Sequence, residues 1–88
     1  MESFINQPEF YPQMEPGETI NVGGTYRHRS GIEYQVEKLL LDATGFESSG
    51  NLTPSVLYTQ LQDGKFSKGT QYVRSVEDFL RNFEYLGT

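Results

Sequence analysis

Apolar and polar side chains alternate on both sides of a Ser-Gly turn, and this pattern constrains the fold more than any other feature of the chain. Every second position of residues 32–36 is a large apolar residue, which is the period of a strand with one buried face. Residues 19–28 alternate in the same way, with a bulge expected at Gly23-Gly24. Ser30-Gly31 reverses the chain between the two segments. The sequence therefore predicts an antiparallel hairpin.

Two further strands are expected in the second half of the chain. Residues 55–62 alternate again and are followed by Asp63-Gly64, a strong hairpin-turn pair. The next strand is expected over residues 70–74. Leu39–Leu41 breaks the alternation, so the strand that contains it is expected to bend or to change faces there. Residues 42–54 are rich in Gly, Ser and Asn and predict a loop.

A short helix is expected to close the domain. Ser75 is followed three residues later by Asp78, which resembles a capping box with Asp in place of Glu. Apolar residues then recur at three-and-four spacing up to Phe83, as on one face of a helix. The prediction is a mainly β fold, a small antiparallel β-barrel or curled sheet with a short C-terminal helix. Its core is expected to contain Tyr26, Tyr34, Val36, Leu40, Val56, Tyr58, Val73, Phe79 and Phe83.

The first 19 residues differ in composition from the rest. Residues 1–20 hold four Glu and no Lys or Arg, so most of the net charge of −5 lies there. The other eight acidic residues and all seven basic residues lie in residues 21–88, which are therefore nearly neutral. Pro8, Pro12 and Pro16 oppose helix and interior strand. We expect residues 1–19 to form an extended acidic arm. Because the arm carries large apolar side chains, we expect it to pack over the domain or over a neighbouring subunit. Residues 20–88 are expected to form a single β-rich domain.

Several functional classes are disfavoured by composition. The chain has no cysteine, which excludes disulfides, thiolate zinc sites and a cysteine nucleophile. No apolar run approaches the roughly 20 residues of a membrane helix, and no basic, apolar signal segment begins the chain, so a cytoplasmic protein without membrane contact is expected. Few Lys and Arg remain for phosphate contacts, which argues against nucleic acid as a partner. One histidine and scattered carboxylates have no metal-ligand spacing, and no cofactor motif is present, so neither a metal nor a cofactor is expected.

A set of short motifs follows a known order. They are Tyr26-Arg27-His28, Gly31, Tyr34-x-Val36, Val56-Leu57-Tyr58, Tyr72-Val73-Arg74 and Phe79. In order and spacing the chain resembles, over about residues 23–83, the bacterial and phage family catalogued as domain of unknown function 1653. Two positions depart from the pattern of that family, with Tyr72 in place of Trp and Ser75 in place of Pro. The resemblance implies a compact domain of SH3-like strand arrangement and no established activity.

Arg74 is the strongest candidate for binding because it lies between a strand and the start of the predicted helix. Its planar guanidinium can hold a phosphate or carboxylate through two parallel hydrogen bonds. With Arg27 or Arg29 nearby, it would form a pocket for a small anion or nucleotide, lined by Tyr26, Tyr58 and Tyr72. The alternative is an internal salt bridge between Arg74 and an acidic residue at the helix start or in the arm.

His28 is the only histidine and titrates near neutral pH. It can act as a general acid or base with Glu33 or Tyr34, or it can simply make one cross-strand hydrogen bond and pack on Tyr34. No residue is assigned a catalytic role. The predicted ligand-binding residues are Arg27, His28, Tyr58, Tyr72 and Arg74.

Three functions remain, in decreasing order of preference. The first is a non-catalytic β-barrel binding module that holds a small polar or anionic ligand or a peptide. The second is a structural or protein-interaction protein, either a homodimer or a protein that binds its partner through the arm. The third is an enzyme that depends on His28.

Overall fold

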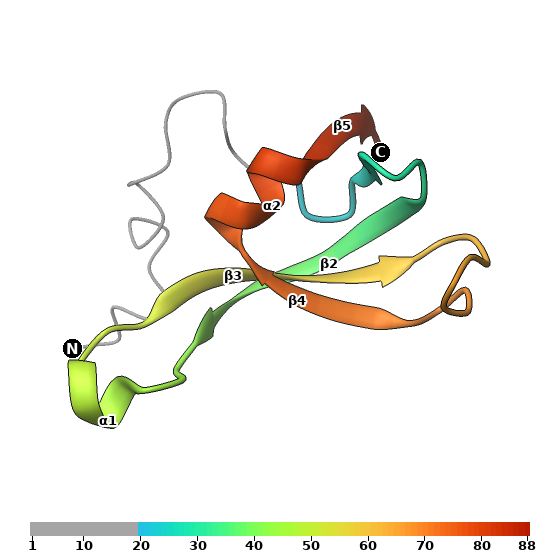
Figure 1. Ribbon diagram of the computed structural model, residues 1–88. Coiled ribbons are helices and arrows are strands. Elements are labelled where there is room, and N and C mark those ends of the chain that lie inside the picture. Colours follow the sequence, from blue (N-terminus) through green and yellow to red (C-terminus); the bar gives the residue numbers. More distant parts are fainter. Residues whose placement is uncertain (1–19) are drawn as a thin grey trace.

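The computed structural model describes residues 20–88, which form one antiparallel sheet with two short helices (Figure 1). The strand order is β4-β3-β2-β1-β5, so β4 and β5 are the two edges and the sheet is not closed. The mainly β fold is thus confirmed, in the form of a curled sheet rather than a closed barrel. The expected arm, residues 1–19, lies outside the described residues. The elements are β1 (Thr25–His28), β2 (Glu33–Asp42), α1 (Phe46–Ser49), β3 (Thr53–Gln60), β4 (Gln71–Ser75), α2 (Val76–Asn82) and β5 (Phe83–Gly87).

The predicted hairpin is present as β1 and β2, with Tyr26 opposite Tyr34. Its turn is closed by the Gly31 N–H, which donates to the His28 carbonyl at 2.7 Å. Gly31 has a φ of 102°, a conformation that glycine adopts without strain. β1 is shorter than the predicted strand 19–28 because a tight turn precedes it, in which the Gly24 N–H donates to the Asn21 carbonyl at 2.9 Å.

The expected change of face in β2 occurs at a bulge. Val36 lies opposite Tyr58, but Lys38 lies opposite Leu57, which leaves Glu37 as the extra residue. The bulge places Leu39 rather than Leu40 on the buried face, opposite Val56. The change of face thus comes just before Leu39–Leu41, where the sequence places it.

The predicted loop over residues 42–54 is shorter in the structure. β2 extends to Asp42, β3 begins at Thr53, and the four-residue helix α1 lies between them. Neither described helix is long and apolar enough to cross a membrane.

Helix α2 begins where the sequence predicts. The Asp78 N–H donates to the Ser75 side-chain oxygen at 3.1 Å, which satisfies one of the free donors of the first turn. The helix ends at Asn82, one residue before the predicted end, and β5 follows directly. β5 pairs antiparallel with β1, with Phe83 opposite His28. This strand was not predicted, and it places the end of α2 beside the β1–β2 turn.

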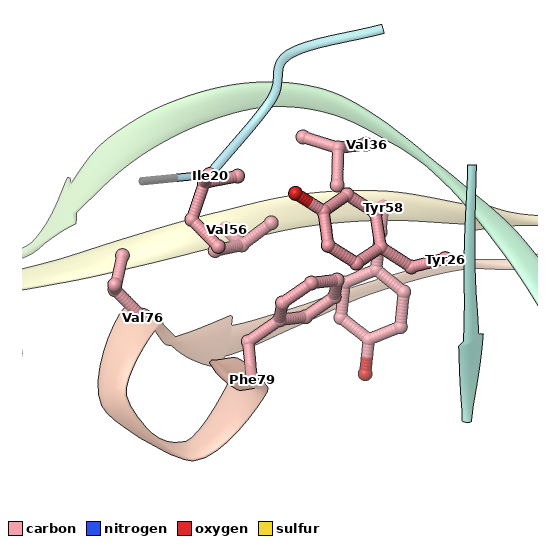
Figure 2. Packing of buried hydrophobic residues seen from close by; sticks show 7 residues of the cluster. All are labelled: Ile20, Tyr26, Val36, Val56, Tyr58, Val76 and Phe79. Carbon is pink, nitrogen blue, oxygen red and sulfur yellow. The ribbon is translucent and has the colours of Figure 1, made fainter. Parts of the chain in front are cut away.

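The core lies between the sheet and α2 (Figure 2). Five of the predicted core residues are confirmed as buried, while Tyr34 and Phe83 are half-buried against them. Val73 is a wrong prediction: it is 52% exposed because it pairs with Leu57 on the face away from α2. Leu40 is only half-buried, because the bulge places Leu39 on the buried face in its stead. The buried residues of this core are Ile20, Tyr26, Val36, Val56, Tyr58, Val76 and Phe79.

Candidate functional site: a cationic cleft beside the aromatic face

Three of the five predicted site residues contact the ring of Phe83, which begins β5, and a fourth stacks on one of them. The His28 ring centroid lies 4.9 Å from that of Phe83, and the Arg74 guanidinium carbon lies 5.1 Å from it. Tyr58 lies 5.3 Å from Phe83, and Tyr72 stacks on Tyr58 at 5.4 Å. The four residues come from β1, β3 and β4 and meet on the face of the sheet that α2 covers.

Arg27 does not join this group. It neighbours His28 along β1, so its side chain leaves the strand on the opposite face. There Nη2 of Arg27 lies 3.4 Å from a carboxylate oxygen of Glu84 in the adjacent strand β5. Both side chains are largely exposed, and such pairs contribute at most about 1 kcal/mol.

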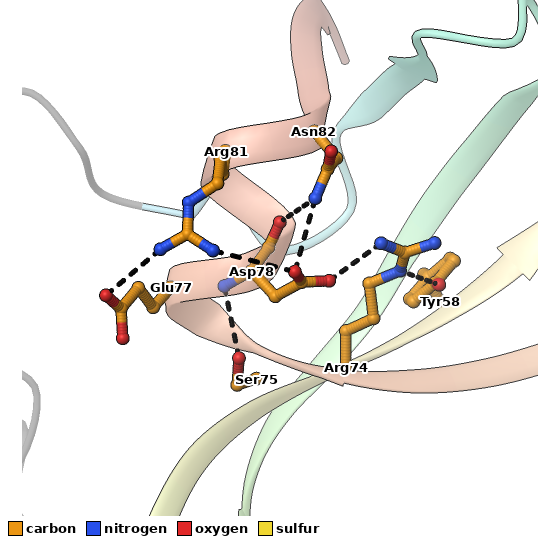
Figure 3. A network of polar contacts seen from close by, with 7 residues as sticks. All are labelled: Tyr58, Arg74, Ser75, Glu77, Asp78, Arg81 and Asn82. Atoms are coloured by element: carbon orange, nitrogen blue, oxygen red, sulfur yellow. Dashed lines mark hydrogen bonds and ion pairs between the residues drawn. The ribbon is translucent and has the colours of Figure 1, made fainter.

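Arg74 is held by internal partners (Figure 3). Its Nε–H donates to the Tyr58 hydroxyl at 2.8 Å, and its Nη1–H donates to Asp78 Oδ2 at 2.7 Å. Burial lowers the pKa of Arg74, but the hydrogen bonds to Tyr58 and Asp78 outweigh it, so the net pKa is raised and the guanidinium stays charged. The geometry is that of the internal salt bridge considered as the alternative to a ligand contact.

Replacing Arg74 with methionine is expected to lower the free energy of unfolding by about 1–2 kcal/mol, because the nearly buried Tyr58 hydroxyl and Asp78 lose a charged donor. Methionine keeps an apolar stem against Phe83, so the change removes the two hydrogen bonds and the contact of the charge with the ring but little apolar packing. Urea unfolding followed by circular dichroism measures it. Arg81→Met is the matched control, because Arg81 is 60% exposed and its loss is expected to cost less than about 0.5 kcal/mol. Equal effects of the two changes would contradict the internal role of Arg74.

Tyr72 is also bound within the protein. Its hydroxyl donates to the side-chain oxygen of Gln60 at 2.6 Å, and Gln60 is 2% exposed. Both predicted site tyrosines therefore use their hydroxyls for internal hydrogen bonds, while their rings build the aromatic face.

An open cleft of about 470 Å³ adjoins this group at the junction of β1, β5 and the end of α2. Three of the four arginines in the sequence line it, against one carboxylate, that of Glu84. The backbone holds the junction together, since the Arg29 N–H donates to the Asn82 carbonyl at 3.2 Å. Two predicted residues line the cleft from opposite faces of β1: His28 from the face that α2 covers, and Arg27 from the other face, where it pairs with Glu84. Its lining is Arg27, His28, Arg29, Gly31, Arg81, Asn82, Phe83 and Glu84.

The hydrogen bonds of His28 determine the tautomer of its neutral ring. Its Nδ1 accepts the Ser30 backbone N–H at 3.0 Å and lies 3.0 Å from the Ser30 hydroxyl. A backbone N–H can only donate, so Nδ1 is unprotonated and the neutral ring carries its hydrogen on Nε2. The ring packs on Phe83, and the contacts expected with Tyr34 or Glu33 are replaced by these.

The pKa of His28 is lowered from 6.5 by burial first, then by the charges of Arg74 and Arg29, against a smaller opposite effect of Asp78. Folding thus opposes protonation of His28. Its contribution to stability is present above pH 6.5 and is lost as the pH falls through the lower pKa of the folded state.

Arg81 and Asn82 were missed as site residues, and Arg29 entered only as an alternative to Arg27. Little in the sequence marks them as site residues, because Arg81 looks like an ordinary basic residue in the last turn of a helix. They join His28 only once β5 has paired with β1, a pairing that no local pattern announces.

Comparison of the chain with protein-family models, with curated proteins and with solved structures finds no match. The resemblance to domain of unknown function 1653 therefore stays a prediction. Within residues 20–88, no group of three His, Cys, Asp or Glu side chains is arranged to hold a metal ion.

Proposed function

We propose that the domain is a non-catalytic binding module that holds a small anionic ligand in the cationic cleft. One observation carries the proposal: three arginines and the only histidine, from β1, the turn after it and α2, line a single open cleft. The chain as a whole is acidic, so this local excess of positive charge runs against its net charge of −5.

The arginines of the cleft are available to a ligand in a way that Arg74 is not. Arg27 is paired with the exposed carboxylate of Glu84 at 3.4 Å, and Arg81 with that of Glu77 at 3.2 Å and, more loosely, with Asp78 at 3.8 Å. Such pairs contribute little, so a phosphate or carboxylate group can replace them at small cost. Arginine suits both groups because its planar fork donates two parallel hydrogen bonds.

One feature opposes an anion here, because the cleft includes the last turn of α2. The free carbonyls at a helix C-terminus repel negative charge by about 0.3–1 kcal/mol. A hydrogen bond from a charged donor contributes about 1.5–3 kcal/mol, so one arginine contact outweighs the repulsion. The balance favours binding when two or more arginines reach the ligand.

Replacing Arg29 and Arg81 together with glutamine is expected to weaken binding of sulfate at least tenfold, because two charge-assisted hydrogen bonds are lost. Binding is measured by following backbone amide signals in NMR spectra during a sulfate titration at constant ionic strength. The matched control is Lys65→Gln with Lys68→Gln, which removes the same charge from the exposed loop between β3 and β4. An equal loss in both double variants would indicate attraction to net charge only and would refute the cleft as a site. The same titration with nucleotides, cyclic dinucleotides and phosphosugars then identifies the ligand class.

The second candidate is a protein-interaction role, and one observation favours it. β5 is an edge strand whose Tyr85 and Leu86 are 46% and 39% exposed. Edge strands with exposed apolar residues can pair with another chain. The molar mass in solution, measured by light scattering with and without residues 1–19, separates an assembly through β5 from one through the arm. If the protein is a monomer and binds anions, the protein-interaction role is refuted and the first proposal stands.

A further inference from the structure

We propose that the cleft takes up its anion together with a proton on His28, so that the affinity for the anion rises as the pH falls. The inference rests on the proposed function, since it assigns a regulation to the same cleft. It follows from how the histidine is bonded and from the charges that face it.

The hydrogen bonds of His28 oppose its protonation. The proton must enter at Nδ1, because the neutral ring already carries hydrogen on Nε2. Nδ1 is occupied by the Ser30 N–H at 3.0 Å, and a protonated Nδ1 cannot accept that bond. The Ser30 hydroxyl, also at 3.0 Å, can reverse its role and accept a bond from the protonated ring. Protonation of Nδ1 is thus unfavourable, but the added hydrogen has an acceptor in the Ser30 hydroxyl.

The charges around His28 add to this cost. Arg29 in the turn and Arg74 on β4 repel an imidazolium, while Asp78 on α2 attracts it less strongly. Arg27 and Arg81 line the same cleft from β1 and α2, with Glu84 of β5 as the one carboxylate of the lining. The ring therefore stays neutral in the empty cleft near neutral pH.

An anion bound in the cleft beside Arg29 offsets that repulsion. It brings negative charge near His28, so the protonated ring becomes more favourable. Thermodynamic linkage then requires the reverse effect, in which a protonated His28 strengthens binding of the anion. The affinity is constant above the pKa of the bound state, rises as the pH falls between the two pKa values, and is constant again below that of the free state.

The test is the pKa of His28 in the full chain, measured by proton NMR with and without saturating sulfate at constant ionic strength. His28 is the only histidine, so its ring signals need no variant for assignment. Sulfate remains a dianion from pH 5 to 8, so the probe itself does not titrate. Sulfate is expected to raise the pKa by about 0.5–1 unit, which corresponds to about a three- to tenfold gain in affinity at low pH.

The outcomes separate the inference from the function on which it rests. If sulfate shifts and saturates the amide signals of Arg29 and Arg81 but leaves the pKa of His28 unchanged, the coupling is refuted and the binding site stands. If sulfate does not bind, both are refuted.

His28→Asn is the matched variant, because the asparagine side-chain oxygen can accept the Ser30 N–H in place of Nδ1 and does not titrate. Its sulfate affinity is expected to be independent of pH from 5 to 8. An unchanged pH dependence in this variant would assign the coupling to another group and overturn the proposal.

Discussion

Replacing Phe79 with alanine is expected to lower the free energy of unfolding by about 3–5 kcal/mol, the largest loss we expect from any single substitution. Phe79 is fully buried on α2 and is the contact between the helix and the sheet. Its ring stacks on Phe83 with centroids 4.0 Å apart, and it meets Tyr26 and Tyr58 at 5.0 and 5.3 Å. Removing the ring leaves a cavity bounded by other aromatic rings, which cannot collapse into it easily.

The loss is large compared with the stability of a domain this small, which is of the order of 5–10 kcal/mol. Thermal and urea unfolding followed by circular dichroism measure it. Phe66→Ala removes the same ring from a position that is 55% exposed and is expected to cost less than about 1 kcal/mol. A Phe79 variant no less stable than the Phe66 variant would show that α2 is not anchored through this ring.

The loss of Phe79 is also expected to reach the cleft. Phe83 stacks on Phe79 on one side and meets His28 at 4.9 Å on the other. The same contact thus anchors the end of α2, which carries Arg81 and Asn82, and the start of β5. The cleft is thus connected to the core through one pair of rings.

Local patterns were enough to predict most of the sheet. The alternation over residues 32–36 and 55–62 is visible because one face of each strand is buried, and the turn residues Ser30-Gly31 mark the hairpin directly. The cap of α2 could be predicted for the same reason, since Ser75 and the Asp78 N–H are only three residues apart. Each of these features is decided by neighbours in sequence.

What could not be predicted depends on contacts between distant segments. β5 has only five residues and its register comes from β1, about 57 residues earlier in sequence, as the pair Arg27 and Glu84 shows. Val73 has the composition of a core residue, but the register of β4 against β3 decides which face it takes. The cleft combines both effects. Its arginines look like surface charges until β5 brings the end of α2 to the β1–β2 turn.

Arg74 illustrates the same limit at the candidate site. The sequence places an arginine between a strand and a helix, and both a ligand contact and a salt bridge fit that position. The choice is made by Tyr58, 16 residues away on β3, whose hydroxyl lies 2.8 Å from Nε. With that bond and the one to Asp78, the guanidinium is better described as part of the fold than as a free ligand-binding group.

Replacing Gln60 with leucine is expected to destabilise the domain by about 2–4 kcal/mol, the second largest loss. Gln60 lies on the same buried face of β3 as Val56 and Tyr58. It is a polar side chain, yet it is only 2% exposed. Its Nε2 donates to the carbonyls of Gln62 and Phe66 at 2.7 and 2.6 Å, and its oxygen accepts the Tyr72 hydroxyl at 2.6 Å. Leucine fills the same space but leaves these three groups without their partner, and each unsatisfied buried group costs about 1–3 kcal/mol. Because the two carbonyls belong to an exposed loop that water can reach, the total stays below the sum of three full penalties.

The effect is expected to be local as well as global, because the backbone of Gln60 holds the same loop through its bonds to Gly69 and Thr70, both at 2.8 Å. Hydrogen exchange should therefore speed up at the Gly69 and Gly64 amides more than in β1 and β2. Gln62→Leu is the matched control, since Gln62 is exposed and its side chain accepts one bond, from the Glu33 N–H at 2.9 Å, so its loss should cost at most about 1 kcal/mol. If both glutamine variants lose the same stability, or if exchange at Gly69 is unchanged, the buried amide of Gln60 does not hold the loop between β3 and β4.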